Sequence, residues 1–158
     1  QPGPGQESVW DYPRPPSLET EVRPVRVEFA GRVIAESRDA KRICETASPP
    51  TYYVPPRDVD QECLVAVTRS SMCEWKGEAA YYDVVVDDRR ASAAVWSYPK
   101  PFRPFGPIAG WLAFMPAAMD GCFVGDARVR PQPGGFYGGW ITPELTGPFK
   151  GEPGTGHW

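Results

Sequence analysis

Histidine is nearly absent from the sequence, and the cysteines are too far apart to form CxxC pairs. The only histidine is His157, and the four cysteines are Cys44, Cys63, Cys73 and Cys122. Structural zinc usually takes four closely spaced cysteine or histidine ligands. A nucleophilic serine or cysteine that works with a histidine base needs that histidine within hydrogen-bond reach. The sequence therefore predicts no metal site and argues against a Ser–His or Cys–His catalytic pair.

The common nucleophile and nucleotide motifs are missing as well. Ser97 lies in VWSYP rather than in G-x-S-x-G, so there is no nucleophile elbow. GEPGTG lacks the lysine and hydroxyl of a phosphate loop, and no GxGxxG follows a predicted strand. Asp58 and Asp60 could hold Mg²⁺ between paired carboxylates, but a solvated turn with a helix cap is the simpler interpretation. No cofactor is predicted.

Blocks of positive charge and long apolar runs are also scarce. The net charge is -3 and the pI about 5.2, and no basic block offers to neutralise phosphates, so no nucleic-acid partner is expected. No apolar run approaches the roughly 18 residues of a membrane span, so no membrane partner is predicted. Four cysteines are too few for a disulfide scaffold and fit small buried thiols in a reducing, cytoplasmic compartment. Gln1 is not a start methionine, so the N-terminus could be processed.

Glycine and proline are abundant instead. The chain holds 16 glycines and 20 prolines, yet it is 41% hydrophobic and 13% aromatic. This composition excludes many long helices and a disordered chain. It predicts a mainly β, single-domain protein of antiparallel hairpins with one or two short helices and long ordered Pro/Gly-rich ends. We divide it into a Pro-rich arm (1–21), a β-rich core (22–131) and a tail packed on the core (132–158), with Trp10 and Tyr12 pinning the arm.

The hydrophobic pattern places most of the strands. Alternation in VRVEF predicts a strand with one buried face, and Ala30-Gly31 would turn it into a hairpin returning over residues 32–35. Ser37 before RDAKRICE predicts an N-cap and a helix of about two turns, which the prolines of TASPPTYYVPP would end. Further strands are predicted over residues 63–68, 78–87 (the longest), 93–98, 122–124 and 127–130, while 108–115 fits a strand or a short helical turn leading into one.

Aromatic residues concentrate in or beside these strands, together with a few polar groups. Trp96 and Tyr98 share one face of a strand, two residues apart. An ordinary aromatic core is one interpretation. The other is a small-molecule pocket, because apolar walls with a few polar groups are the usual form of such a site. Lys76 could point into this pocket, place its charge on Trp75, or form a structural ion pair with Glu45.

Several stretches resemble one known family. CETASPPTYYVPPRDV, CEWKGEAAYYDV, AVWSYPKP and GWLAFMP look like the domain of unknown function 427 family, and VWDYPRPP and GGFYGGWITPELTGPFKGEPGT resemble the flanks of its longer members. The resemblance implies an all-β domain of the β-tent kind, similar in architecture to methionine sulfoxide reductase B and cereblon-like domains. Those relatives commonly carry zinc on paired CxxC knuckles, which this chain lacks, so neither the metal nor reductase chemistry carries over. The family has also been labelled a nucleotidyltransferase, but the glycine–serine turn with paired acids of such enzymes is not visible here.

The resemblance also implies which residues form a site. The candidate ligand-binding residues come from three of the matching stretches and are Glu45, Tyr53, Cys73, Lys76, Trp96 and Tyr98. We expect Lys76 to point its ammonium into an aromatic cavity with Glu45 nearby. Gly77 would permit an unusual dihedral angle or a close backbone approach just before the strand.

Three functions stay open at this point. The first is the binding of a small, anionic or planar ligand, which a deep pocket would favour. The second is an enzyme that uses Lys76 and Glu45, with Cys73 as nucleophile, which an exposed thiolate near Lys76 would favour. The third is a partner-binding module that uses the aromatic tail, which a flat apolar patch would favour. Neither the reaction nor the oligomeric state follows from the sequence.

Overall fold

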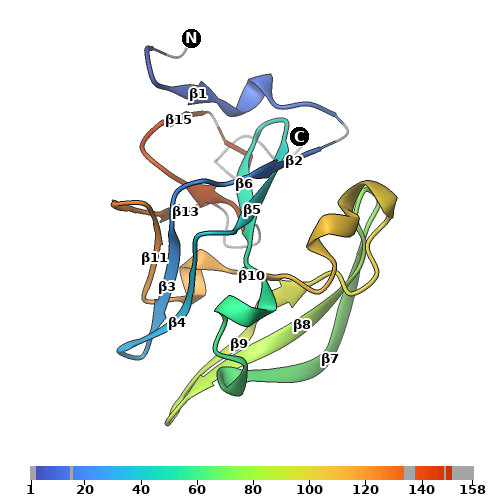
Figure 1. The fold of residues 1–158 in the computed structure, drawn as a ribbon, viewed down its shortest axis with the longest axis vertical. Coiled ribbons are helices and arrows are strands. Elements are labelled where there is room, and N and C mark those ends of the chain that lie inside the picture. The colour runs from blue at the N-terminus through green and yellow to red at the C-terminus, as the bar shows by residue number, and fades with distance from the viewer. Residues whose placement is uncertain (1–2, 15, 134–137, 148, 151–158) are drawn as a thin grey trace.

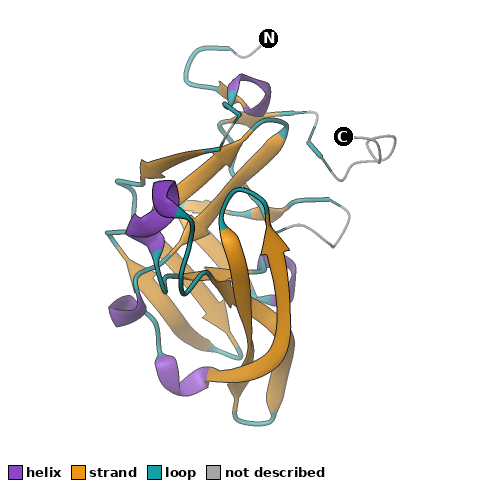
Figure 2. Cartoon of the chain, turned by 90° about the vertical axis from the view of Figure 1, so that its right-hand side faces the viewer, coloured by secondary structure: helices purple, strands orange, loops and turns teal. Residues whose placement is uncertain are grey.

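The protein is built almost entirely from antiparallel strands, as the sequence predicts (Figures 1 and 2). The computed structural model describes residues 3–14, 16–133, 138–147 and 149–150. Its helical segments are short 3-10 turns, namely η1 (Val9–Asp11), η2 (Pro56–Asp58), η3 (Gln61–Cys63), η4 (Arg103–Ile108) and η5 (Pro116–Ala118). Within these described ranges, no helix is long and apolar enough to cross a membrane.

The first four-stranded sheet contains both short hairpins that the sequence predicts. Its strands, in spatial order, are β12 (Ala127–Arg128), β11 (Gly121–Val124), β3 (Val25–Phe29) and β4 (Arg32–Ser37). The alternating residues Val25, Val27 and Phe29 are buried, as the period of two requires for a sheet with one covered face. Ala30 and Gly31 make the turn with positive φ angles.

The second four-stranded sheet is longer and more strongly curved (Figure 1). Its order is β10 (Leu112–Phe114), β9 (Arg89–Ser97), β8 (Gly77–Val86) and β7 (Leu64–Cys73). The predicted strand 63–68 extends to Cys73, so β7 is as long as β8, at 10 residues each. The pairing register shifts between Ala66 and Ser70 and again between Tyr82 and Val84. Such bulges bend a strand and raise its twist.

The three-stranded sheet corrects the helix that the sequence predicts over residues 38–45. Its order is β2 (Ser17–Thr20), β5 (Lys41–Glu45) and β6 (Ser48–Tyr53). Ser37 does not cap a helix, because its hydroxyl donates to Asp58 and accepts from the backbone N–H of Asp39. β5 is instead paired on both sides, and this long-range pairing overrides the local helical signal.

β6 forms a strand although it contains Pro49 and Pro50. Proline cannot donate to a β ladder and is confined to edge strands and bulges. β6 meets both conditions, since it lies at the edge of its sheet and its register against β5 shifts between Ile43 and Glu45. The sequence pattern gave this stretch only as the end of a helix and did not predict the strand, from which Tyr52 and Tyr53 project.

The main core joins the sheets to the tail. Trp140, in β14 (Trp140–Ile141), is completely buried and stacks on Tyr52 with the ring centroids 5.0 Å apart. Its indole N–H donates to the backbone oxygen of Phe114 at 3.1 Å. β14 pairs with β13 (Arg130–Pro131). Burying an aromatic side chain of this size contributes roughly 3 kcal/mol, so residues of the tail belong to the folded body.

The arm and the tail also contact each other. β1 (Glu7–Ser8) pairs in parallel with β15 (Leu145–Thr146), and the two lie side by side in Figure 1. Val9 and Tyr12 of the arm share a buried cluster with Leu145 of the tail. The expectation that both arm aromatics are buried is right for Tyr12 but wrong for Trp10, which is 42% exposed. Phe136 and Tyr137, also expected to pack on the core, lie outside the described residues.

Candidate functional site

A cavity of about 560 Å³ lies against the aromatic face of the long sheet. β7, β8 and β9 supply Ser71, Tyr81 and Trp96 to its wall, and β6 supplies Tyr53. Tyr81 and Trp96 are paired across β8 and β9, so their side chains project from the same face of the sheet. Gly138, from the tail, closes part of the wall against Trp96.

Most of the residues singled out in the sequence meet at this cavity. Its lining includes Tyr53, Cys73, Lys76, Trp96 and Tyr98. Glu45, the sixth candidate, is not among the lining residues. It ends β5 and is half-buried, and its negative charge is a minor contribution that raises the pKa of Tyr98.

The floor of the cavity is aromatic and deeply buried. Tyr53 is 1%, Tyr98 6% and Trp96 9% exposed. The indole N–H of Trp96 donates to the Tyr53 hydroxyl at 3.4 Å. Burial raises the pKa of both tyrosines well above the ordinary value, and the nearby Cys73 raises it further. Both hydroxyls therefore stay protonated at neutral pH and keep a proton to donate.

Tyr98 offers a hydroxyl that the protein does not use. The rings of Tyr98 and Tyr53 lie 6.3 Å apart at an angle of 46°. Tyr81, by contrast, shares a hydrogen bond of 2.8 Å with Ser71. Within the described part of the chain, the Tyr98 hydroxyl has no hydrogen-bond partner, and it opens into the cavity. Because it is not among the buried atoms that lack a partner, this hydroxyl can donate to water or to a ligand in the cavity.

The charged groups on the cavity wall are all positive. Arg69, Lys76 and Lys150 line it, and no aspartate or glutamate of the described residues does. The guanidinium of Arg69 lies 4.6 Å from the centroid of the Tyr81 ring, and the Lys76 Nζ lies 5.9 Å from that of Tyr98. These distances fit cation–π contacts, which hold a cation at an aromatic face without neutralising it.

The turn before β8 directs Lys76 into the cavity. Gly77 has φ of +111°, and a Cβ built there would lie 3.5 Å from the backbone oxygen of Lys100. The backbone N–H of Phe102 donates to the Lys76 oxygen at 2.9 Å. Of the two roles expected for Gly77, the unusual dihedral is confirmed, whereas the neighbouring backbone lies at ordinary contact distance. The sequence suggested that Lys76 could place its charge on Trp75. Its Nζ lies instead over the ring of Tyr98.

The proposed structural ion pair between Lys76 and Glu45 does not form. Neither residue takes part in an ion pair among the described residues, whereas the buried Glu21 does so with Arg23 at 2.8 Å. Lys76 is thus a cation held only at an aromatic face. This leaves its charge available to a ligand.

Cys73 differs from the other three cysteines. All four are free thiols, but only Cys73 is partly exposed and lies on the cavity wall. Burial raises the pKa of the Cys44 and Cys122 thiols to about 12. No base among the described residues hydrogen-bonds the Cys73 sulfur. A nucleophile activated by such a base is therefore not part of the geometry that the described residues form.

Sequence reasoning missed two of the cationic residues. Arg69, Ser71 and Cys73 alternate along β7 and share one face. Their spacing would have predicted that Arg69 lines the same site as Cys73, had the sequence shown that β7 extends to Cys73. Lys150 comes from the tail, where its backbone oxygen accepts from the side chain of Gln132 at 2.6 Å. Only the tertiary fold brings it to the cavity.

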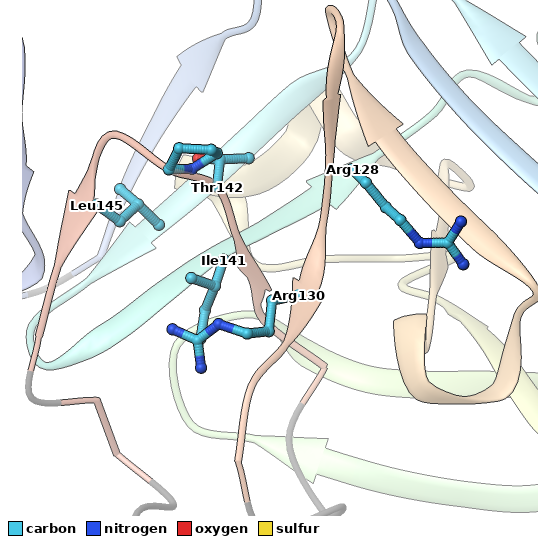
Figure 3. A pocket seen from close by; sticks show the side chains of 6 residues that line it. Arg128, Arg130, Ile141, Thr142 and Leu145 are labelled. Carbon is cyan, nitrogen blue, oxygen red and sulfur yellow. The ribbon is translucent and has the colours of Figure 1, made fainter.

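A smaller hollow of about 260 Å³ lies beside β12 to β15 and also contains two arginines (Figure 3). The guanidinium groups of Arg128 and Arg130 point away from each other in this view. Arg128 donates to the backbone oxygen of Asp120 and lies 5.6 Å from the Phe123 ring centroid. The two charges therefore do not converge on one anion.

The acidic and thiol side chains of the described ranges do not gather into a cluster. No three histidine, cysteine, aspartate or glutamate side chains gather there as a metal site would require. Asp60 caps η3 by accepting from the backbone N–H of Glu62, and Asp58 accepts from Ser37. These carboxylates serve a turn and a cap, as the sequence favoured over a Mg²⁺ site.

Comparison with known proteins places the chain in one family. No curated protein matches it. The family model described as "Domain of unknown function (DUF427)" matches residues 17–125, which is more than half of the chain and contains most of the cavity-lining strands. The chain belongs to the domain of unknown function 427 family.

Proposed function

We propose that the protein binds a small molecule with a planar or apolar body in the cavity next to Trp96. The observation that carries this proposal is the Tyr98 hydroxyl. It is protonated, belongs to a side chain that is only 6% exposed and lines the cavity, and has no hydrogen-bond partner among the described residues. A donor that lines a cavity and has no partner in the protein is available to fix the orientation of a ligand bound there.

The size and chemistry of the cavity support the same function. Its volume of about 560 Å³ falls within the roughly 300–1,000 Å³ range of small-molecule sites. Trp96 and Met115 supply apolar surface, while Thr51 and Ser71 add hydroxyls. Apolar walls with a few convergent polar groups bind a ligand and fix its orientation.

The two alternative functions have less support. An enzyme using Cys73 as nucleophile would need a base near its sulfur, and the described residues supply none by hydrogen bond. A partner-binding module would need a continuous apolar patch. Among the described residues, the large exposed apolar side chains come from several elements, and they are Trp10, Val22, Val33, Val65, Met72, Trp75 and Phe102.

The test is a titration with N-phenyl-1-naphthylamine, an uncharged aromatic dye that fluoresces in apolar surroundings. We expect saturable binding of one dye per chain. Alkylating Cys73 with N-ethylmaleimide should abolish it, since the adduct would occupy the cavity. In the matched control, Cys73→Ser, the same treatment should leave binding unchanged. A fluorescence signal that rises linearly with dye concentration and does not saturate would contradict the proposal. So would dye binding that stays unchanged after Cys73 has been alkylated.

A further inference from the structure

We infer that the ligand of this cavity is an anion, whose carboxylate, phosphate or sulfonate oxygens bind Lys76 and the Tyr98 hydroxyl while its apolar body lies along Trp96. This inference rests on the proposed function and names the chemical class of the ligand. It goes beyond the presence of an aromatic cavity, which a neutral molecule would fill equally well.

The first support is the sign of the local charge. The chain carries a net charge of -3, yet the charged residues lining the cavity are Arg69, Lys76 and Lys150. Such a cavity, lined by one sign of charge and walled by apolar side chains, focuses the field and concentrates ions of the opposite sign. A cationic ligand would be repelled, and a neutral one would gain nothing from these side chains.

The second support is the way in which Lys76 and Tyr98 are arranged. Lys76 Nζ lies over the Tyr98 ring, 5.9 Å from its centroid, and forms no ion pair within the described ranges. Other cations of the protein form ion pairs with buried carboxylates, as Arg23 does with Glu21 and Arg90 with Asp83. Lys76 therefore keeps its charge available on the wall of the cavity that Tyr98 also lines.

The third support is that the hydroxyl is a donor at every relevant pH. Burial raises the pKa of Tyr98 well above its ordinary value, so it stays neutral near Lys76 and presents an O–H to an incoming oxygen. Hydrogen bonds in which one partner is ionised are shorter and about twice as strong as neutral ones. A neutral donor and a cation that line the same cavity are complementary to an oxyanion.

The experiment compares two dyes of similar shape. 8-Anilinonaphthalene-1-sulfonate carries a sulfonate, and N-phenyl-1-naphthylamine is its uncharged counterpart. For Lys76→Met and for Tyr98→Phe, we expect the sulfonate to bind about tenfold more weakly, the loss typical of one charge-assisted hydrogen bond. The neutral dye should lose clearly less affinity than the sulfonate in both variants, so the ratio of the two affinities should fall.

Two matched variants serve as controls. Lys100→Met removes an exposed lysine that does not line the cavity, and Tyr82→Phe removes a hydroxyl from the neighbouring strand position outside the lining. Both should leave the affinities of both dyes unchanged. Raising the salt concentration from about 0.01 M to 1 M should weaken the binding of the sulfonate dye but not that of the neutral dye, since the Debye length falls from about 30 to 3 Å.

Competition identifies the anionic group. 3-Phenylpropionate and phenyl phosphate should each displace the sulfonate dye at lower concentrations than uncharged 3-phenyl-1-propanol, and the more potent of the two identifies the preferred headgroup. If the alcohol competes as well as both anions, or if Lys76→Met weakens both dyes equally, the anion inference is wrong although a binding site exists. If neither dye binds saturably, the proposed function itself fails.

Discussion

The ammonium of Lys76 lies over the ring of Tyr98, with Nζ 5.9 Å from the ring centroid, and not beside the carboxylate of Glu45. The sequence left open whether Lys76 points into an aromatic cavity, contacts Trp75 or pairs with Glu45. A cation at an aromatic face is weakly committed, because such a contact contributes roughly 0.5–1 kcal/mol at partly exposed sites. Removing the Lys76 charge should therefore change the charge of the cavity with little effect on the stability of the fold.

Lys76→Met should therefore change the free energy of unfolding by no more than about 0.5 kcal/mol, the usual range for a surface substitution. Adding Glu45→Gln should give an additive result, because the two side chains form no pair. Arg23→Met is the positive control, since it deprives the buried Glu21 of its partner and should cost at least about 1 kcal/mol. Denaturant melts measure all three. A loss near 3 kcal/mol for Lys76→Met that the double variant recovers would show a structural ion pair.

Gly77→Ala should destabilise the protein by about 1–3 kcal/mol, since φ of +111° is strained for any residue with a Cβ. The added methyl itself finds ordinary contact distances, of which the shortest is 3.5 Å to Lys100, so the cost lies in the backbone. Gly106→Ala is the matched control, because Gly106 has open space and no positive φ. Equal denaturation midpoints for the two variants would contradict the conformational explanation.

One thiol per native chain should react rapidly with 5,5′-dithiobis(2-nitrobenzoate) at pH 8, and four after unfolding. Cys73 is the partly exposed thiol, whereas burial raises the pKa of Cys44 and Cys122 to about 12 and that of Cys63 above its ordinary value. Reactivity follows the thiolate and its access. Cys73→Ser should abolish the rapid phase. A rapid phase that persists in this variant would place the accessible thiol elsewhere.

Stability should fall as the pH drops below about 4.5, in part through Glu21. Burial alone would raise the pKa of Glu21, but hydrogen bonds from Arg23 and from Tyr52 outweigh it and hold the pKa below its ordinary value. A carboxyl whose pKa is lower in the folded state stabilises the fold above its unfolded pKa and loses this contribution as the pH falls through the folded value. The pKa of Glu144, which is paired with Arg23, is lowered too.

Glu21→Gln tests this contribution. It should cost about 1–3 kcal/mol at pH 7, the value of hydrogen bonds to a charged group, and the variant should lose less stability than the wild type between pH 5 and pH 3. Some pH dependence should remain, because Glu144 titrates in the same window. Urea melts at each pH measure the difference. Parallel stability–pH curves for variant and wild type would show that Glu21 has no shifted pKa.

The sequence predicts those parts of the fold that local patterns control. The hairpin of β3 and β4 follows from alternation and a turn, and both are local. β5 could not be predicted, because RDAKRICE favours a helix and only its two partner strands hold it extended. Tyr53, Cys73 and Lys76 were found through their stretches of sequence, while Lys150 reaches the cavity from a tail whose position depends on contacts with Ala47 and Gln132.

The parallel pairing of β1 with β15 sets an order of events during synthesis. Glu7 lies opposite Leu145, so nearly the whole chain lies between the two strands. β1 leaves the ribosome early, yet it has no partner until residues 145–146 have been made, and closing so long a loop is favourable only after the intervening sheets have compacted it. Of the described strands, β1 is synthesised first and is among the last to be paired, so a nascent chain stalled before residue 145 would hold β1 without its neighbour.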